Sequence, residues 1–166
     1  MVNHRPDSIR SQILREKGIE PPADWNDLAQ VKAAKKREIG ADCSAAIYAG
    51  VTVGDKHYSL TDHDQTELMA QLSTVKEGAA AVPYHADGEL CRLYPASEFL
   101  ALAAAAMSHI FYHRTYCNHL NAWIKRATVK QLDGIAYGAQ LPKDLQESMD
   151  ALIAAAAPRE GGETGE

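Results

Sequence analysis

One long helical segment constrains the fold of this chain more than any other feature of its sequence. Between residues 99 and 127, apolar and aromatic side chains recur at alternating steps of three and four over four heptads. This heptad seam consists of Phe99, Leu102, Ala106, His109, His113, Tyr116, Leu120, Trp123 and Ala127. Such spacing is typical of a helix that packs lengthwise against a neighbour. We predict one helix over residues 97–128, on the order of 45 Å long at 1.5 Å per residue.

The sequence before this helix alternates between helical and strand-like periods. Helical spacing predicts helices over residues 8–17, 26–48 and 61–76. Asp24 is the expected cap of the second helix, and Thr61 or Asp62 that of the third.

Two β-hairpins are predicted between these helices. Strand-like runs at 51–53 and 57–60 flank a connection that contains Gly54, and runs at 81–85 and 89–94 flank the turn dipeptide Asp87-Gly88. The predicted fold class is α+β. Two hairpins form a small antiparallel sheet packed against the long helix, with flanking N- and C-terminal helices.

The pattern also predicts how the chain is divided. We expect an N-terminal arm and linker at 1–25, because Pro21-Pro22 breaks the chain, and an α+β core domain at 26–128. A C-terminal helical segment at 129–157 contains a helix opened by Pro142. The Gly/Glu-rich tail at 158–166 is predicted to be disordered.

Charge and hydropathy argue against several classes of partner. The 166 residues include 17 basic and 22 acidic side chains, a formal net charge of −5. A protein that binds a nucleic-acid backbone needs a basic surface to displace counterions, so nucleic acid is not expected as a partner. No apolar run reaches the roughly 18 residues of a spanning helix, and residues 1–6 lack the apolar core of a signal peptide. We therefore expect no membrane partner, and a protein made and kept in the cytosol or built into a particle there.

Catalytic signatures are missing from the sequence. It contains no GxSxG nucleophile elbow, no Walker A lysine, no GxGxxG after a strand and no ordered Ser/His/Asp set. The three cysteines form no CxxC pair, which argues against a zinc ribbon. We therefore predict a non-enzymatic protein without a cofactor.

His109 and His113 lie one helical turn apart, and Cys117 continues their line. Two histidines at this spacing can share a metal ion, so a small metal- or ligand-binding domain is one alternative. The glutamate of an HExxH motif is missing, because Ile110, Phe111 and Tyr112 stand between the histidines. In an oligomer, the same two side chains could instead form polar layers that set the register.

Residues 35–127 resemble a domain of unknown function that is common in the tail genes of tailed bacteriophages. The resemblance is carried by the stretches KKREI at 35–39, GVTVGDKHYSL at 50–60, TDHDQ at 61–65, the Asp87-Gly88 hairpin and YPASEF at 94–99. It implies a structural component of a virion tail (tail tip, baseplate or tail fibre) assembled in the host cytoplasm, with other phage tail proteins as partners. A tail-fibre assembly chaperone is the alternative.

The long helix supplies the predicted contact residues. Its second half is rich in amphipathic aromatic side chains, which often occupy surfaces between protein chains. The predicted interface comprises Phe99, Leu102, Tyr112, Tyr116, Leu120 and Trp123. Because this helix is longer than a small sheet requires, we expect a homo-oligomer. A helix docked wholly within its own domain would need no such partner.

Overall fold

The computed structural model describes residues 7–157, so the tail predicted at 158–166 lies outside the described residues. The chain forms two compact units. Unit 1 combines the chain up to Lys36 with the chain from Thr115 onward, and unit 2 is Arg37–Arg114. The expected domain at 26–128 stays a prediction.

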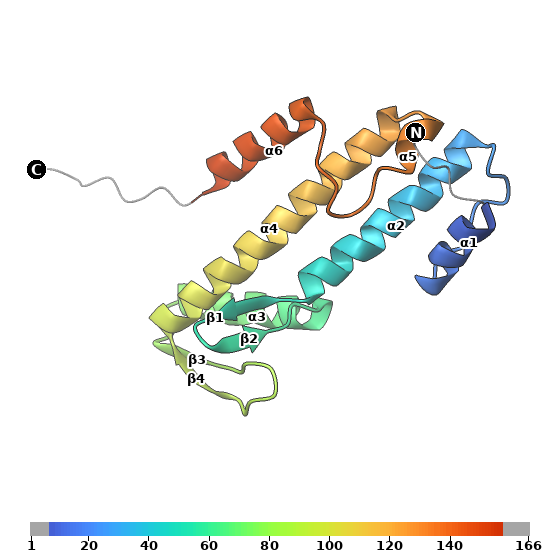
Figure 1. The fold of residues 1–166 in the computed structure, drawn as a ribbon. Coiled ribbons are helices and arrows are strands. Elements are labelled where there is room, and N and C mark those ends of the chain that lie inside the picture. Colours follow the sequence, from blue (N-terminus) through green and yellow to red (C-terminus); the bar gives the residue numbers. More distant parts are fainter. Residues whose placement is uncertain (1–6, 158–166) are drawn as a thin grey trace, which may run out of the picture. The chain divides into compact units, whose positions relative to one another are not determined.

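Helices and hairpins follow one another along the described chain (Figure 1). The elements are α1 Asp7–Glu16, α2 Leu28–Tyr48, β1 Val51–Val53, β2 Lys56–Tyr58, α3 Asp62–Lys76, β3 Ala81–Tyr84, β4 Arg92–Pro95, α4 Ala96–Arg126, α5 Val129–Leu132 and α6 Lys143–Ala156. The α+β class and the long helix are confirmed. The short helix α5 was not expected from the sequence.

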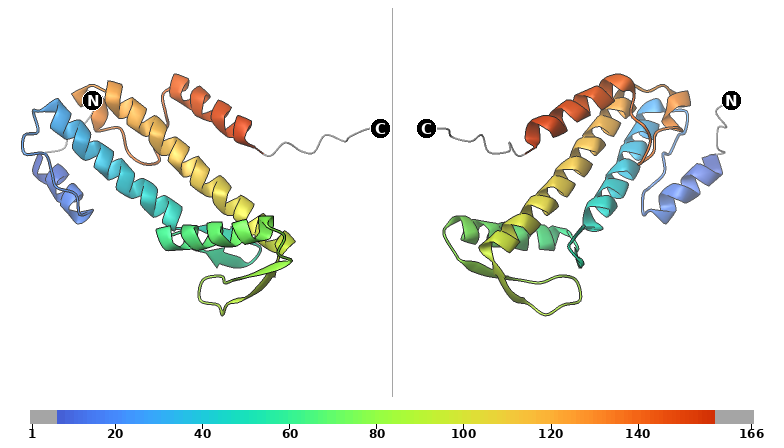
Figure 2. Two further views of the ribbon diagram at one scale, coloured as in Figure 1. Left: turned by 180° about the vertical axis from the view of Figure 1, so that it is seen from behind. Right: turned by 60° about the vertical axis from the view of Figure 1, so that its left-hand side comes forward.

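Each hairpin forms its own two-stranded antiparallel sheet, so the structure has two small sheets where the sequence suggested one. In the first, Val53 pairs with Lys56, and the turn is therefore one residue shorter than predicted. Gly54 has φ +64°, a conformation that side chains other than glycine rarely adopt. Views from two further sides show α3 beside both hairpins (Figure 2).

The second hairpin differs more from the prediction. Asp87-Gly88 forms the predicted turn, since the N–H of Glu89 donates to the carbonyl oxygen of Ala86 at 3.1 Å. The strands end farther from this turn than predicted, because Tyr84 pairs with Arg92 and a loop spans residues 85–91. The cause is tertiary, because Asp87 is bound to the first hairpin through its carboxylate and its backbone N–H. These contacts hold the turn against the first hairpin, and strand pairing begins only at Arg92.

Helix caps were predicted with mixed success. Thr61 caps α3 in a capping box with Asp64, as expected. Asp24 was the wrong cap for α2. The carboxylate of Asp27 instead accepts the backbone N–H of Ala29 and of Gln30, at 2.9 and 3.2 Å, and α2 accordingly begins at Leu28.

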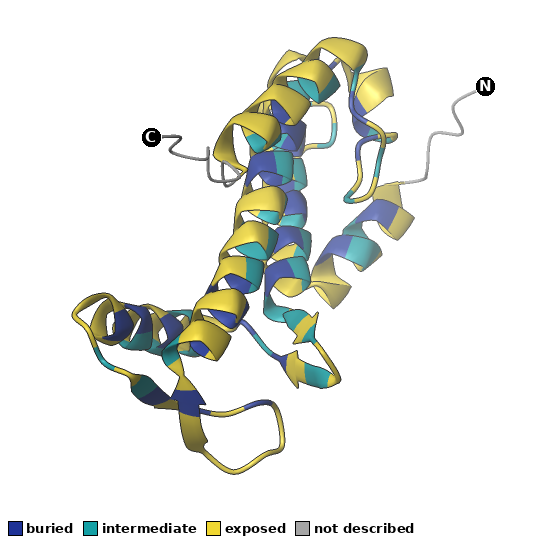
Figure 3. Cartoon of the chain, turned by 90° about the vertical axis from the view of Figure 1, so that its left-hand side faces the viewer, coloured by how far each residue is buried: buried dark blue, intermediate teal, exposed yellow. Residues whose placement is uncertain are grey.

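Most helices bury one side and expose the other, which gives each unit its core (Figure 3). In unit 2 the fully buried apolar side chains include Ile39, Leu60, Leu68, Val82, Phe99 and Leu102. In unit 1 they include Leu120, Ile124, Leu132 and Ile135. Helices α2 and α4 contribute to both cores, because each runs across the division between the units.

Side-chain contacts fix the loops of unit 1. The guanidinium of Arg10 in α1 binds the carboxylate of Asp133 and lies 5.1 Å from the centre of the Trp25 ring. Farther along, Tyr116 donates its hydroxyl hydrogen to the carbonyl oxygen of Ala139 at 2.5 Å and stacks edge-on against Tyr137. These contacts hold α1 and the loop at 133–142 within the same unit.

Candidate interaction site

An aromatic cluster joins the two hairpins of unit 2. Tyr84 contacts the rings of Tyr58, Tyr94 and Phe99, with ring centres 5.4 to 6.3 Å apart. The hydroxyls of Tyr58 and Tyr94 are hydrogen-bonded to each other at 3.1 Å. Because all four side chains are buried, this cluster sets the position of the second hairpin on the first and on α4.

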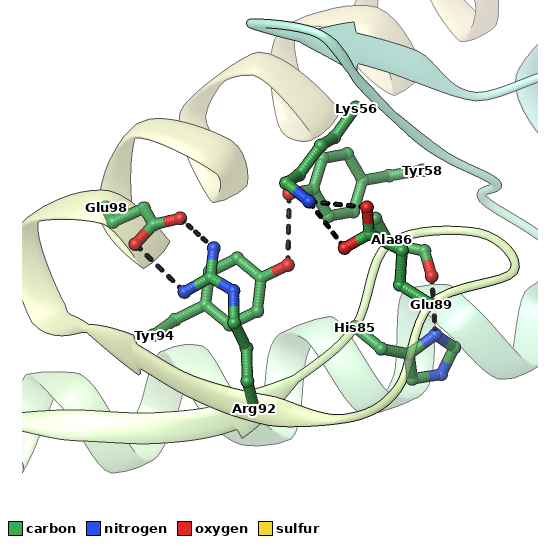
Figure 4. Close-up of polar contacts among 8 residues, drawn as sticks. All are labelled: Lys56, Tyr58, His85, Ala86, Glu89, Arg92, Tyr94 and Glu98. Carbon is green, nitrogen blue, oxygen red and sulfur yellow. Dashed lines mark hydrogen bonds and ion pairs between the residues drawn. The ribbon is translucent and has the colours of Figure 1, made fainter.

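Two ion pairs cover the edge of this cluster (Figure 4). The guanidinium of Arg92 lies 3.7 Å from the centre of the Tyr94 ring and binds both oxygens of Glu98. Lys56 lies 2.5 Å from both carboxylate oxygens of Glu89. The first pair attaches β4 to the first turn of α4, and the second attaches the loop at 85–91 to β2.

Residues 85–93, a segment distinct from the N-terminal stretch predicted at 1–25, are called the arm from here on. The carboxylate of Asp87 accepts hydrogen bonds from the backbone N–H of Ser59 at 3.0 Å and from its hydroxyl at 2.6 Å, and the N–H of Asp87 donates to the carbonyl of His57. Beyond these anchors, Leu90 in the loop is 92% exposed and Leu93 in β4 is 67% exposed. The arm is thus attached at its base while it presents large apolar side chains to solvent.

Titratable groups around the arm are held in their ordinary charge states. The hydrogen bond with Glu89 raises the pKa of Lys56, and the hydrogen bond with Arg92 lowers the pKa of Glu98. Burial raises the pKa of Tyr84 to about 12 and raises that of Tyr58 as well. None of these shifts moves a group toward neutral pH, where a general acid or base is most effective.

One arrangement near the arm was not found from the sequence. The hydroxyl of Thr52 lies 3.1 Å from Nδ1 of His57, and Nε2 of His57 lies 3.8 Å from the carboxylate of Asp87. A hydroxyl, an imidazole and a carboxylate in line are the parts of a nucleophilic triad. Here the His57–Asp87 distance is too long for a hydrogen bond, Asp87 is already bound by Ser59, and all three residues are solvent-exposed. We therefore interpret the arrangement as surface hydrogen bonding.

A groove of about 740 Å³ opens between α3 and α4 within unit 2. Its lining is mostly apolar and consists of Asp62, Gln65, Thr66, Leu68, Met69, Met107, Ile110, Phe111 and Arg114. Met69, Met107 and Phe111 are 49%, 46% and 39% exposed, so large apolar surface faces solvent along its rim. Methionine-rich surfaces of this kind adapt readily to a partner.

The predicted interface residues have different environments in the structure. Three of them, Phe99, Leu102 and Leu120, are 0 to 1% exposed, so their side chains offer no surface to another chain. Tyr116 and Trp123 are half-buried, and the hydroxyl of Tyr116 is bonded within unit 1. Tyr112 is 47% exposed, and its interface role stays a prediction.

His109 and His113 are in contact, with ring centres 4.4 Å apart. Nε2 of His109 donates to the carbonyl oxygen of Ala46 at 3.0 Å, so this nitrogen carries a proton and is not presented to a metal. Burial, reinforced by His109, lowers the pKa of His113. Among residues 7–157, no group of three or more His, Cys, Asp or Glu side chains is placed to hold a metal ion.

Two further results concern the whole described chain. None of its helices combines the length and the hydropathy needed to cross a membrane. Residues 30–139 match the family model described as "Domain of unknown function (DUF4376)". The comparison finds no match among curated proteins and none among solved structures.

Proposed function

The chain belongs to the DUF4376 family, and we propose that it is a non-enzymatic structural component of a bacteriophage tail. It is assembled in the host cytoplasm and acts at the tail tip, baseplate or fibre by contacting other tail proteins. The resemblance of residues 35–127 to a domain of phage tail genes supports this proposal. That stretch lies inside the matched range of 30–139.

The observation that carries the proposal is the arm. Its base is fixed by the bonds of Asp87 and by the ion pair between Lys56 and Glu89, while Leu90 and Leu93 face solvent. A fixed segment loses little conformational entropy when it binds, which favours association. Large exposed apolar side chains in a positioned loop are a common means of contacting another protein.

The polar residues beside the arm support a binding role over a catalytic one. Arg92 and Glu98 neutralise each other and attach β4 to α4, and Lys56 does the same for the arm through Glu89. These groups are already used in holding the hairpins in place. The arrangement therefore favours a rigid contact surface.

A first experiment is an inventory of particles. Tails purified from the virus that encodes the chain should contain it at a fixed copy number, measured by quantitative mass spectrometry. Presence in assembly intermediates but absence from mature tails would identify the chain as an assembly chaperone. Absence from both would contradict the proposal.

A second experiment locates the contact on the arm. The double variant Leu90→Asp and Leu93→Asp should fold normally and be depleted from particles by at least about tenfold, because two charges are placed in an apolar contact. Leu152→Asp is the matched control, since Leu152 is 49% exposed but lies in α6 of unit 1. Equal incorporation of both variants would show that the arm is not the contact.

A further inference from the structure

Among the exposed residues of helix α3, five lie in one line at alternating steps of four and three residues. They are Asp62, Thr66, Met69, Ser73 and Lys76, all on its solvent side. We call this line the seam; residues at this spacing lie on one side of a helix, and here only the central Met69 is apolar. Within its own unit α3 already buries a different side, through Leu68, Leu72 and Val75. The exposed seam is therefore an additional surface.

The seam is complementary to itself when reversed. Met69 lies at its centre, and Asp62 and Lys76 lie seven residues on either side. If two copies of α3 pack antiparallel with their Met69 side chains together, Asp62 of each copy faces Lys76 of the other. A twofold axis creates this pair of contacts twice, and it brings the hydroxyls of Thr66 and Ser73 close together. Opposite charges at these positions favour this register over others.

Apolar surface next to the seam would be buried when a second copy of α3 packs there. The groove beside α3 is lined by Met107, Ile110 and Phe111 of α4, two of which are well exposed. The exposed α4 positions Leu100, Ala104, Met107 and Phe111 repeat the same spacing. Met69 of a second copy can therefore pack on an existing apolar lining.

We propose that the exposed side of α3, with the adjoining groove, is the contact between two copies of this chain related by a twofold axis. The proposal assigns the expected self-association to a surface other than the predicted α4 seam, most of which is buried. It adds to the proposed function without depending on the tail assignment. Oligomeric state in solution and incorporation into particles are separate readouts.

The test is a charge exchange between two variants of the full chain. Asp62→Lys leaves a seam with lysine at both ends, and Lys76→Glu leaves one with acids at both ends. Each variant alone should dimerise at least about tenfold more weakly than the wild type, because like charges face each other twice. Mixed in equal amounts, the two should form a heterodimer, because every facing pair is again opposite in sign. Sedimentation velocity with one variant labelled measures all three species.

Matched controls distinguish charge repulsion between the two copies from effects of the new charges on the stability of helix α3. His63→Lys and Thr74→Glu place the same charges in the same turns, about 100° around the helix from the seam. They reproduce the interaction of the introduced charge with the helix dipole, without the loss of Asp62 or Lys76, and should leave dimerisation unchanged. Tyr48 also hydrogen-bonds to Asp62 within unit 2, so the urea midpoint of each variant is measured alongside.

A third variant covers the case in which Asp62→Lys fails to fold. Met69→Glu changes an exposed side chain at the axis, so that two like charges meet and the chain should become monomeric. The proposal is overturned if the wild type stays monomeric at a protein concentration of about 100 μM, which would mean a dissociation constant too high for a specific dimer. It is also overturned by a dimer unaffected by Met69→Glu, or by two folded charge variants that do not combine.

Discussion

The hydroxyl pair of Tyr58 and Tyr94 is the polar centre of an otherwise apolar cluster. Both side chains are nearly fully buried, at 4% and 1% exposure, and their hydroxyls are bonded at 3.1 Å. A buried hydroxyl that loses its partner carries the cost of desolvation without compensation. This pair should therefore fix the relative position of the two hairpins more strictly than apolar packing alone.

Replacing one hydroxyl of this pair should destabilise the protein. Tyr58→Phe is expected to lower the free energy of unfolding by about 1–3 kcal/mol, because the hydroxyl of Tyr94 is left buried without that bond. The double variant with Tyr94→Phe should cost less than the two single changes added together. Urea unfolding of the wild type, the two single variants and the double variant measures the cycle. Additive single changes would show that the bond contributes nothing.

Alanine substitutions at Gly50 and Gly54 separate the effect of a close contact from the effect of a positive φ. Both have positive φ, +78° and +64°, so alanine is strained at either position by about 1–2 kcal/mol. Only at Gly50 would the new Cβ meet another atom, the carbonyl oxygen of Tyr58 at 2.0 Å. Gly50→Ala should therefore cost about 1–3 kcal/mol more than Gly54→Ala, as for other overpacked sites. Equal losses in thermal unfolding would contradict this close approach of β2 to Gly50.

At the scale of single elements, the sequence predicted the helices and their caps better than it predicted which elements contact one another. The Thr61–Asp64 capping box and the long α4 helix are local patterns, and both were read correctly. The strand ends beside the Asp87-Gly88 turn were predicted wrongly, because the loop at 85–91 is held by Ser59, which is far away in sequence. A heptad seam shows that one side of a helix is covered but not by what. The sequence therefore could not show that Phe99 and Leu120, which it placed at a predicted interface, are buried within the described chain.

The candidate site illustrates the same limit. The sequence assigned no site role to Arg92, Glu98 or Lys56, because nothing local indicates that they flank the same tyrosine cluster. The exposed seam of α3 was equally hidden. Its spacing becomes informative only once Leu68, Leu72 and Val75 are known to be the buried side.

The histidine pair of α4 should make the stability of this element depend on pH. Burial and the neighbouring His109 lower the pKa of His113 below its usual 6.5, so the unfolded chain binds this proton more readily than the folded one. Stability should fall as the pH drops below about 6.5 and be unaffected by this residue above it. His113→Gln should remove part of the slope in urea unfolding between pH 7.5 and 5.5. An unchanged slope in that variant would exclude His113 as its source.

For the molecule as a whole, the arm is a strongly exposed internal segment of the described chain. Leu90 is 92% exposed within a loop, whereas the divisions between the two units fall inside α2 and α4. Chymotrypsin should therefore make its first cut within residues 7–157 at Leu90, because backbone in a helix resists proteolysis. Mass spectrometry of a time course identifies the cut, and Leu90→Ser should suppress it. Early release of residues 37–114 as a separate fragment would contradict this expectation.

The position of these divisions also limits how the protein can be rearranged. Genes commonly exchange domains at loops, where a junction tolerates added or lost residues. A transplant of residues 37–114 would instead have to rejoin two interrupted helices. One surplus residue at either junction would turn all following side chains by about 100° and move the buried positions out of phase. We therefore expect folded chimaeras only where both junctions, in α2 and in α4, keep the buried positions on the same side of the helix.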